Sequence, residues 1–361
     1  MQSNPPTASQ QLDFLKKIER LLSHGSFTAT YKYALLIALA NLAVEKGDDS
    51  DSELPIDLDD LAQEFARLYW TAPRPFGNLG EPLRQSRAGD QDAIIEIVLP
   101  VAEKTGWAYS RVREYAGGVG DMTRSARRLV CRYPLFHLQE VREVHGGLSE
   151  PDNFLYERPS ASEAERMRMQ LISLKPGVGA CLRRLHGVVV RLCESEWARW
   201  LRKANTKLGA DSKLEDELFG DERADLSHVV EPLMGLQEGR CFYSGRRLDG
   251  GDGIQVDHFI PWSMFAFDSA FNLVLVRKEI NASKSASLAS PRHLEKVLAR
   301  NRESAGALEQ MGGAAIDSKK FRSVARWAYD AAESNQWLTW DWSDRAERRQ
   351  LDDSWRRLLV D

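Results

Sequence analysis

The sequence predicts a mainly α-helical protein that carries one small α+β module between helical N-terminal and C-terminal regions. Two observations support this fold class. Apolar residues recur at helical spacing through much of the chain, as in residues 31–42. Two short runs rich in β-branched and aromatic residues, 256–260 and 271–276, lie close together and precede a polar segment of helical character. At 361 residues the chain is long enough for two or three domains.

The first 70 residues are expected to form a helical core. Residues 1–10 are interpreted as a disordered tail, and a helix is predicted over 12–23. A second helix carries one apolar stripe, formed by Tyr31, Ala34, Leu35, Ala38, Leu39 and Leu42. After an extended piece at 54–56, Asp57 can cap a helix over 58–70. The same order suits a winged-helix module, but the repeat is apolar and no basic recognition helix stands out, which favours a plain helical core.

The middle of the chain is less regular. Residues 71–80 are rich in Pro and Gly and predict a loop, and a helix over 93–99 is expected to end or kink at Pro100. The glycine-rich segment 117–121 is excluded as a phosphate loop, because it lacks the Gly-Lys-Ser/Thr ending and a preceding strand. A strand is predicted at 154–156, and residues 160–205 have a helical outline.

Four arginines form one stripe on a predicted helix that follows the glycine-rich segment. They recur at i, i+3, i+4 and i+8: Arg124, Arg127, Arg128 and Arg132. A run of charges is usually a solvated helix face. Because the stripe is made of arginine alone and has weak acidic pairing, it is also a candidate for contact with nucleic-acid phosphates.

The chain is predicted to divide into five parts. They are the tail (1–10), a mostly helical N-terminal region that positions substrate or a partner (11–209), a charged linker (210–225), a module built on the two β-like runs (226–300) and a helical, Trp-rich C-terminal cap (301–361). The C-terminal tryptophans are interpreted as a packed cap rather than a stacking platform for single strands.

Four polar residues in and around the β-like runs suit metal-assisted hydrolysis of a phosphodiester. The order strand, loop, strand, helix can bring them together: Asp257, His258, Asn272 and Asn281. Asp257 and Asn281 offer the hard oxygen ligands that Mg²⁺ or Mn²⁺ prefers. An imidazole can take a proton from attacking water at neutral pH, which suits His258. Neighbours on a strand point to opposite faces, so Asp257 and His258 can share one site only if the strand end bends before Pro261.

This segment resembles the HNH, or ββα-metal, endonucleases. The shared pattern is Asp-His-x-x-Pro, an Asn before an apolar strand, and Asn-x-x-Lys ending at Lys284. Asn272 follows His258 by 14 residues and precedes Asn281 by nine, spacings similar to those of the HNH domain of RNA-guided CRISPR nucleases. The resemblance covers about residues 240–290, a small part of the chain.

The resemblance implies a role for each matching residue. His258 would be the general base, Asp257 and Asn281 would be metal ligands, Asn272 would hold the loop and the histidine, and Lys284 would lie near phosphate. The implied cofactor is Mg²⁺ or Mn²⁺. The implied partner is DNA, with RNA not excluded.

One feature of the family is missing. Many members hold a structural zinc ion with two pairs of cysteines, but here the first pair falls on Cys-Phe-Tyr-Ser at 241–244 and the second near 277–280, where no Cys occurs. A closed structural zinc site needs four N or S ligands, so no structural zinc is expected. The hairpin must then be held by packing, for which Phe242, Tyr243 and Leu248 are the apolar candidates.

A further basic stripe lies just after the motif. Ser290 and Pro291 predict the start of a helix, which carries Arg292, Lys296 and Arg300 at i, i+4 and i+8. Contact with phosphate and plain surface solvation are both consistent with this stripe.

We therefore expect a metal-dependent HNH endonuclease module within a mostly helical protein. One such site suits nicking of duplex DNA, and the build is similar to bacterial restriction or anti-phage nucleases, so other defence-system proteins would be partners by analogy. Two alternatives stay open: a DNA-binding or assembly subunit with a degenerate nuclease fold, and an RNA-directed nuclease toxin. The intact polar residues oppose the first alternative, and the missing cysteines slightly favour it.

Whole-chain properties are less specific. The net charge of −4 at pH 7 does not indicate a nucleic-acid binder, although basic residues can be confined to a groove. The cysteines show no paired metal spacing and suit buried thiols in a reducing compartment: Cys131, Cys181, Cys193 and Cys241. No apolar run is long enough to span a membrane and the N-terminus lacks a signal-peptide core, so a cytoplasmic protein without a membrane partner is expected. The sequence does not indicate an oligomeric state.

Overall fold

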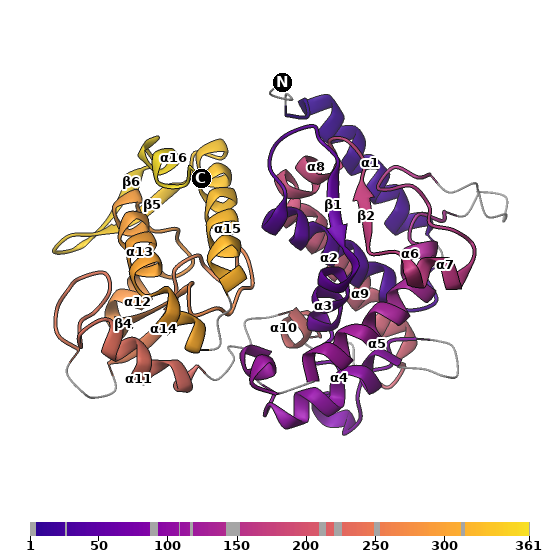
Figure 1. The fold of residues 1–361 in the computed structure, drawn as a ribbon, viewed down its shortest axis with the longest axis horizontal. Coiled ribbons are helices and arrows are strands. Elements are labelled where there is room, and N and C mark those ends of the chain that lie inside the picture. Colours follow the sequence, from indigo (N-terminus) through magenta and orange to yellow (C-terminus); the bar gives the residue numbers. More distant parts are fainter. Residues whose placement is uncertain are drawn as a thin grey trace. The chain divides into compact units, whose positions relative to one another are not determined.

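The computed structural model describes residues 5–25, 27–86, 93–107, 109–115, 118–141, 152–208, 214–219, 226–248, 253–311 and 315–360. Contacts within the chain divide it into two compact units, Met1–Glu222 and Arg223–Asp361 (Figure 1). Helices dominate both units, and each sheet in the described part has two antiparallel strands. This agrees with the mainly helical fold class that the sequence predicts. Among the described residues, none of the helices combines the length and the apolar character needed to cross a membrane.

The first unit contains twelve helical segments and one pair of strands in its described part. In chain order they are α1 (Ala8–His24), α2 (Tyr31–Lys46), β1 (Leu54–Asp57), α3 (Leu58–Leu68), η1 (Gly77–Leu79), α4 (Ala93–Lys104), η2 (Tyr109–Glu114), α5 (Gly118–Arg132), α6 (Pro134–His137), α7 (Glu163–Arg168), β2 (Leu171–Leu174), α8 (Val178–Arg184), α9 (His186–Ala204) and α10 (Leu214–Phe219).

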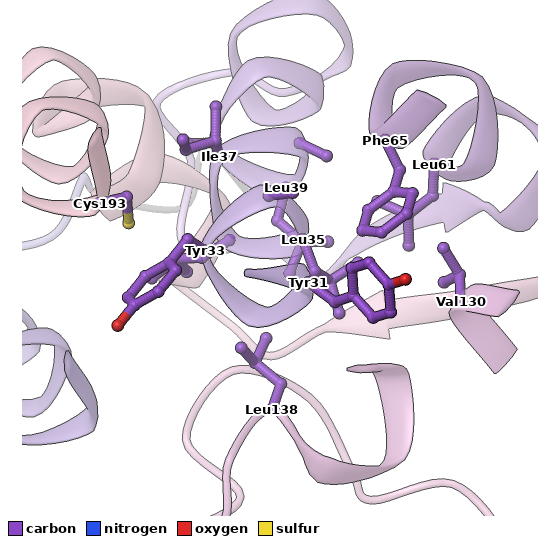
Figure 2. Packing of buried hydrophobic residues seen from close by; sticks show 14 of the residues in the cluster. Tyr31, Tyr33, Leu35, Ile37, Leu39, Leu61, Phe65, Val130, Leu138 and Cys193 are labelled. Atoms are coloured by element: carbon purple, nitrogen blue, oxygen red, sulfur yellow. The ribbon is translucent and has the colours of Figure 1, made fainter. Parts of the chain in front are cut away.

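Helix α2 is the centre of the first unit. Every residue from Tyr31 to Val44 is buried, so the helix is enclosed on all sides rather than along the single predicted stripe. Helices α3, α8 and α9 pack against it, and Figure 2 shows Phe65 of α3 and Cys193 of α9 beside its side chains. A helix enclosed by protein cannot enter a DNA groove, so α2 is a core helix, as the helical-core interpretation expects.

Two helix starts in this unit follow from capping side chains. Helix α1 begins at Ala8, earlier than predicted, because the Thr7 hydroxyl accepts a hydrogen bond from the Gln10 N–H at 3.3 Å. The Gln10 side chain accepts in return from the Thr7 N–H at 2.7 Å, which completes a capping box. Asp57 caps α3 as predicted, accepting from the Asp59 N–H at 2.7 Å.

Other predictions for this unit were wrong in detail. Strand β2 lies inside the segment predicted to be helical, and it is the partner of β1 in a register from Leu54↔Leu174 to Asp57↔Leu171. The predicted strand at 154–156 contributes only a bridge between Tyr156 and Leu174. Helix α4 does not end at Pro100 but continues to Lys104, with apolar residues buried on both sides of the proline, such as Val98 and Val101. Most of the predicted linker 210–225 lies outside the described residues, and its part 214–219 forms α10.

The second unit contains the module built on the two β-like runs together with the C-terminal segment. In chain order its elements are α11 (Ser227–Leu236), β3 (Ile254–His258), β4 (Leu273–Arg277), α12 (Lys278–Lys284), α13 (Pro291–Glu303), α14 (Ala305–Gln310), α15 (Ala315–Ser334), β5 (Leu338–Trp342), β6 (Ala346–Gln350) and α16 (Ser354–Leu358).

The C-terminal tryptophans pack inside this unit. Trp340 in β5 and Trp355 in α16 are almost fully buried, as the cap interpretation requires, whereas Trp337 is exposed. Strand β5 lies beside the connection between α12 and α13: the Trp340 N–H donates to Leu288 O at 2.8 Å and the Ser290 N–H donates to Trp340 O at 2.7 Å. The end of the chain is therefore part of the same packed body as the predicted site.

Candidate active site

The candidate site is built on β3, β4 and α12. The strands pair antiparallel from Ile254↔Arg277 to His258↔Leu273, and α12 begins directly after β4 and packs against both strands. Branched residues such as Val256 and Val274 favour the pleated backbone of this hairpin. The strand, loop, strand, helix order expected from the sequence is present. It places Asp257 and His258 at the end of β3.

Asp257 lies in a buried ion pair. Its side chain is 8% exposed, and its two oxygens lie 3.2 Å and 3.0 Å from the Lys284 ammonium. The Tyr243 hydroxyl donates to the same carboxylate at 2.8 Å. Burial, followed by the negative charge of Asp257, holds the pKa of Tyr243 well above its usual value, so the hydroxyl keeps its proton and acts as a donor.

Lys284 contacts both Asp257 and His258. Its side chain is fully buried, and its ammonium also donates to the His258 carbonyl oxygen at 2.9 Å. The resemblance implied that Lys284 lies near phosphate. In the structure its charge faces Asp257 and a hydrogen bond ties it to the end of β3, while its position near phosphate stays a prediction.

His258 is held by a residue that the sequence did not single out. Its Nε2 lies 2.7 Å from Asp268 Oδ1, and both side chains are 11% exposed. The centroid of the Trp262 ring lies 5.1 Å from that of the imidazole, with the two planes tilted by 55°. An ionised carboxylate can only accept, so a neutral ring paired with ionised Asp268 would carry its proton on Nε2. Nδ1 is then the nitrogen that can receive a proton.

Asn272 fixes the backbone of the loop that joins His258 to Asp268. The side chain is fully buried. Its Oδ1 accepts from the Ile260 N–H at 2.8 Å, and its Nδ2 donates to Ile260 O at 3.1 Å and Phe267 O at 3.3 Å. These bonds join the residues just after His258 to those just before Asp268 and close the loop between them.

Asn281 presents an amide oxygen on the same face as Asp257. Its Nδ2 donates to Gln255 Oε1 at 2.8 Å, and Oδ1 accepts no hydrogen bond from the residues that the structure describes. Gln255 and Asp257 are two apart on β3 and share a face of the strand, while Asn281 and Lys284 are one turn apart on α12. His258, next to Asp257, points to the loop that carries Asp268.

Two of the three cations on α13, Lys296 and Arg300, bind main-chain carbonyl oxygens of the same unit. The guanidinium of Arg300, a half-buried residue, donates to Leu273 O at 2.9 Å and Phe271 O at 3.1 Å. Burial lowers the pKa of Arg300 to about 10. Lys296 donates to Phe242 O and lies over the ring of that residue. For Arg300 this corrects the expectation of phosphate contact, because a cation bound to two buried carbonyls is not available to a ligand.

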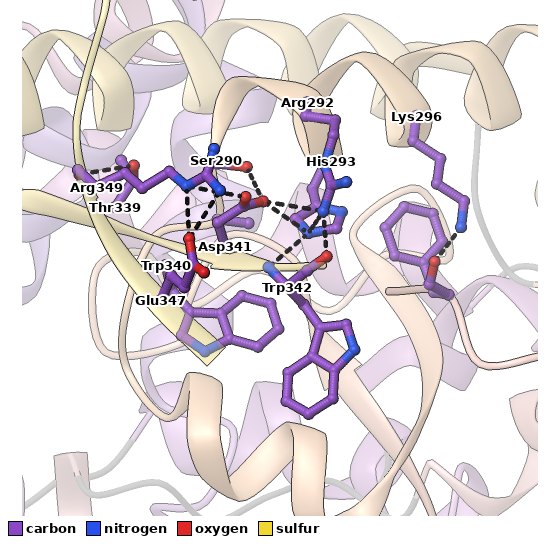
Figure 3. A network of polar contacts seen from close by, with 12 residues as sticks. Ser290, Arg292, His293, Lys296, Thr339, Trp340, Asp341, Trp342, Glu347 and Arg349 are labelled. Atoms are coloured by element: carbon purple, nitrogen blue, oxygen red, sulfur yellow. Dashed lines mark hydrogen bonds and ion pairs between the residues drawn. The ribbon is translucent and has the colours of Figure 1, made fainter. Parts of the chain in front are cut away.

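The remaining member of the basic stripe on α13, Arg292, belongs to a polar network between α13 and the β5–β6 hairpin (Figure 3). The buried Asp341 accepts from the Ser290 hydroxyl at 2.7 Å and from Arg292 at 3.2 Å, and Arg349 lies 3.3 Å away. Burial alone would raise the pKa of Asp341, but the bond from Ser290 and the nearby cations lower it below its usual value.

This network is in contact with the site through aromatic rings. The Tyr243 ring meets the rings of His293 and Trp340 edge-on, at centroid distances of 5.1 Å and 5.0 Å. Tyr243 in turn binds Asp257. The C-terminal strand therefore stabilises the position of the carboxylate through one intervening side chain.

The arginine stripe on α5, in the first unit, is also partly engaged. Arg127 binds Asp59 at 2.8 Å and donates to Met169 O, with a side chain only 13% exposed, so it is not free to meet a phosphate. The other three members are exposed: Arg124, which pairs with Asp121, Arg128, and Arg132, which lies 3.7 Å from Glu163. The solvated-face interpretation suits these three as well as phosphate contact does.

The segment where a zinc knuckle would lie is closed by main-chain bonds. The Cys241 N–H donates to Arg246 O at 2.9 Å and the Phe242 N–H donates to Leu275 O at 3.0 Å, which attaches the turn to β4. Phe242, Tyr243 and Leu248 are buried, as the packing expectation requires. Over the described ranges, no group of three or more His, Cys, Asp and Glu side chains could hold a metal ion. The expected absence of zinc stays a prediction.

The residues of the site fit Mg²⁺ or Mn²⁺ in their donor chemistry. Mg²⁺ is commonly bound through one or two carboxylates, with water and substrate phosphate completing its shell. Asp257 would supply the carboxylate, and Oδ1 of Asn281 would supply a second hard oxygen on the same face. The cation that already contacts Asp257 is the Lys284 ammonium.

Comparison with known proteins finds a family match for one segment of the chain. Residues 241–290 match the model of the HNH endonuclease family. This confirms the resemblance for that part of the chain, which carries an HNH endonuclease domain. Such a domain implies a nucleic-acid substrate, and HNH nucleases typically use a divalent metal ion. The chain matches no curated protein and no solved structure.

Three side chains of the site were missed as site residues: Tyr243, Gln255 and Asp268. Asp268 was the easiest to find, because it is an acidic residue in the loop that Asn272 closes. Gln255 shares a strand face with Asp257, which alternation alone would show. Tyr243 was named only for packing, and nothing in its local sequence indicates its bond to Asp257.

Proposed function

We propose that the second unit hydrolyses phosphodiester bonds in nucleic acid, with His258 as the general base. The observation that carries this proposal is the His258–Asp268 pair at the end of the strand that also bears Asp257. Asp268 fixes the proton on Nε2 and leaves Nδ1 to take a proton from water. The carboxylate of Asp268 then stabilises the imidazolium that forms.

Asp257 and Asn281 are proposed to hold a divalent ion through their carboxylate and amide oxygens. When bound, Mg²⁺ or Mn²⁺ would neutralise charge that develops on the phosphate. Asn272 keeps the loop closed so that His258 and Asp268 stay within hydrogen-bond distance. Tyr243 keeps the carboxylate of Asp257 aimed through a hydrogen bond to one of its oxygens.

Duplex DNA is the proposed substrate, and nicking is the proposed outcome. One base and one metal position can hydrolyse one strand in each encounter, so supercoiled plasmid should become open circle before any linear DNA appears. A setting in bacterial restriction or anti-phage defence is proposed from family analogy alone.

The decisive test compares wild type with His258→Ala on plasmid DNA and on RNA, with Mg²⁺ and with EDTA. Loss of a general base typically lowers the rate by about 10²–10⁴-fold. His24→Ala, at an exposed histidine in α1, is the matched control and should keep full activity. Cleavage by His258→Ala at the wild-type rate would refute the assignment, and RNA cleavage without DNA cleavage would change the substrate.

One observation favours a second candidate, a nucleic-acid-binding subunit with a nuclease fold that does not cleave. The buried Lys284 ammonium already neutralises Asp257, as a permanent structural ion pair would. If this candidate is correct, the purified protein binds DNA and leaves it uncut at every Mg²⁺ or Mn²⁺ concentration.

A further inference from the structure

The Lys284 ammonium occupies the position beside Asp257 that a metal ion would take if Asp257 were its ligand. The ammonium lies within 3.2 Å of one Asp257 oxygen and 3.0 Å of the other. The side chain is fully buried, so these contacts are not a surface ion pair that water could replace. The third partner, the His258 carbonyl oxygen at 2.9 Å, keeps the ammonium at the end of β3.

A divalent ion and this ammonium cannot both be in direct contact with Asp257 at no cost. The Asp257–Lys284 pair is neutral, and a divalent ion added to it leaves two excess positive charges in a buried site. Like charges at contact distance repel strongly where water is excluded. The ion must therefore move the ammonium off the carboxylate, and the surplus charge needs an anion.

We propose that Lys284 is the resident counter-ion of Asp257, which a divalent metal displaces, and that a nucleic-acid phosphate supplies the new partner for the displaced charge. This inference rests on the proposed function of the same site. It makes metal binding and phosphodiester binding mutually dependent: each is weak alone and strengthens the other. Free protein is then kept without a tightly bound metal until nucleic acid arrives.

The test measures Mn²⁺ binding to the full-length protein by the electron paramagnetic resonance signal of free Mn²⁺. Lys284→Met should bind Mn²⁺ at least tenfold more tightly than wild type, because the carboxylate then has no counter-ion. Lys278→Met is the matched control, since Lys278 is an exposed residue of the same helix, and it should bind like wild type. The double variant Asp257→Asn, Lys284→Met should lose the added affinity.

A second arm adds a short DNA duplex in the His258→Ala background, which keeps the DNA uncut. The duplex should raise Mn²⁺ affinity at least tenfold when Lys284 is present and much less in Lys284→Met. Mn²⁺ should also raise the melting temperature of Lys284→Met more than that of wild type, because an ion that binds only the folded state stabilises it. If Lys284→Met does not fold, Lys284→Gln removes the charge and keeps a donor for the same comparison.

Unchanged or weaker Mn²⁺ binding by both charge-removing variants would overturn the inference. Its failure is distinct from failure of the proposed function. A wild type that cleaves DNA while Lys284→Met gains no affinity refutes only the counter-ion role. A wild type that never cleaves, with a Lys284→Met variant that binds Mn²⁺ more tightly, refutes the nuclease and supports the counter-ion role.

Discussion

Replacing Asp268 by asparagine tests the chemistry of the site with a minimal change of shape. The substitution keeps the size of the side chain and removes its charge. An amide can also turn its NH₂ group toward Nε2, which would place the ring proton on Nδ1 and block that nitrogen as a base. The imidazolium formed by proton uptake would lose the carboxylate that lies 2.7 Å from it in the wild type.

The expected loss follows from the burial of this pair. Both side chains are only 11% exposed, so solvent cannot replace the missing partner. A hydrogen bond to a charged group contributes about 1.5–3 kcal/mol. At ~1.4 kcal/mol for each tenfold change in rate, kcat should fall about 10- to 150-fold. KM for DNA should change little, since Asp268 acts through His258.

The assay is single-turnover nicking of supercoiled plasmid at saturating Mg²⁺, paired with ¹⁵N NMR of the His258 ring. The NMR spectrum should move from a single Nε2–H tautomer to a mixture or to the Nδ1–H form. Asp344→Asn, at an exposed carboxylate of the same unit, is the control and should leave both measurements unchanged. A rate for Asp268→Asn within twofold of wild type, with an unchanged tautomer, would refute the orienting role.

Two further predictions concern the stability of the second unit. Asn272→Ala removes three hydrogen bonds from a fully buried side chain and should lower the free energy of unfolding by about 3 kcal/mol in urea titrations, and an unchanged midpoint would contradict the loop-holding role. Burial, helped by the charge of Arg292, lowers the pKa of His293 from 6.5 to about 4, so the unfolded chain binds the proton more readily between these values. Stability should therefore fall by about 3 kcal/mol as pH drops from 6.5 to 4, and His293→Gln should remove this part of the acid sensitivity. In the wild type, His293 Nε2 accepts from the Trp342 N–H at 3.2 Å, which agrees with a neutral ring. An equally steep pH profile in His293→Gln would refute the assignment.

Much of the site could be predicted because its residues belong to one continuous segment. The alternation that ends at His258, the branched run at β4 and the polar stretch of α12 are local patterns, and they imply the strand, strand and helix that place Asp257 and Asn281 on one face. Asn272 was predicted for the same reason, because its partners Ile260 and Phe267 lie in the adjoining loop.

The parts that could not be predicted depend on how the elements pack against one another rather than on local sequence pattern. Arg300 has the spacing of a surface cation, and only the packing of α13 on the end of β4 shows that its charge binds main-chain carbonyls. The sequence around Lys284 suggests a phosphate contact, and only the packing of α12 shows that its ammonium pairs with Asp257. Strand β2 has no recognisable strand pattern of its own, and its pairing with β1 decides its conformation.

The support that strand β5 gives to Tyr243 has a consequence for biosynthesis. Trp340 lies far beyond the HNH segment in the order of translation, and it contacts the ring whose hydroxyl binds Asp257. Arg300 and Asn301, which hold the main chain at Phe271, are also made later than the residues they hold. A nascent chain that has released only the HNH segment from the ribosome therefore lacks the supports of its carboxylate. We expect the site to be fully supported only after the strand that carries Trp340 has emerged, so any cutting activity would follow synthesis of β5 rather than of the HNH segment alone.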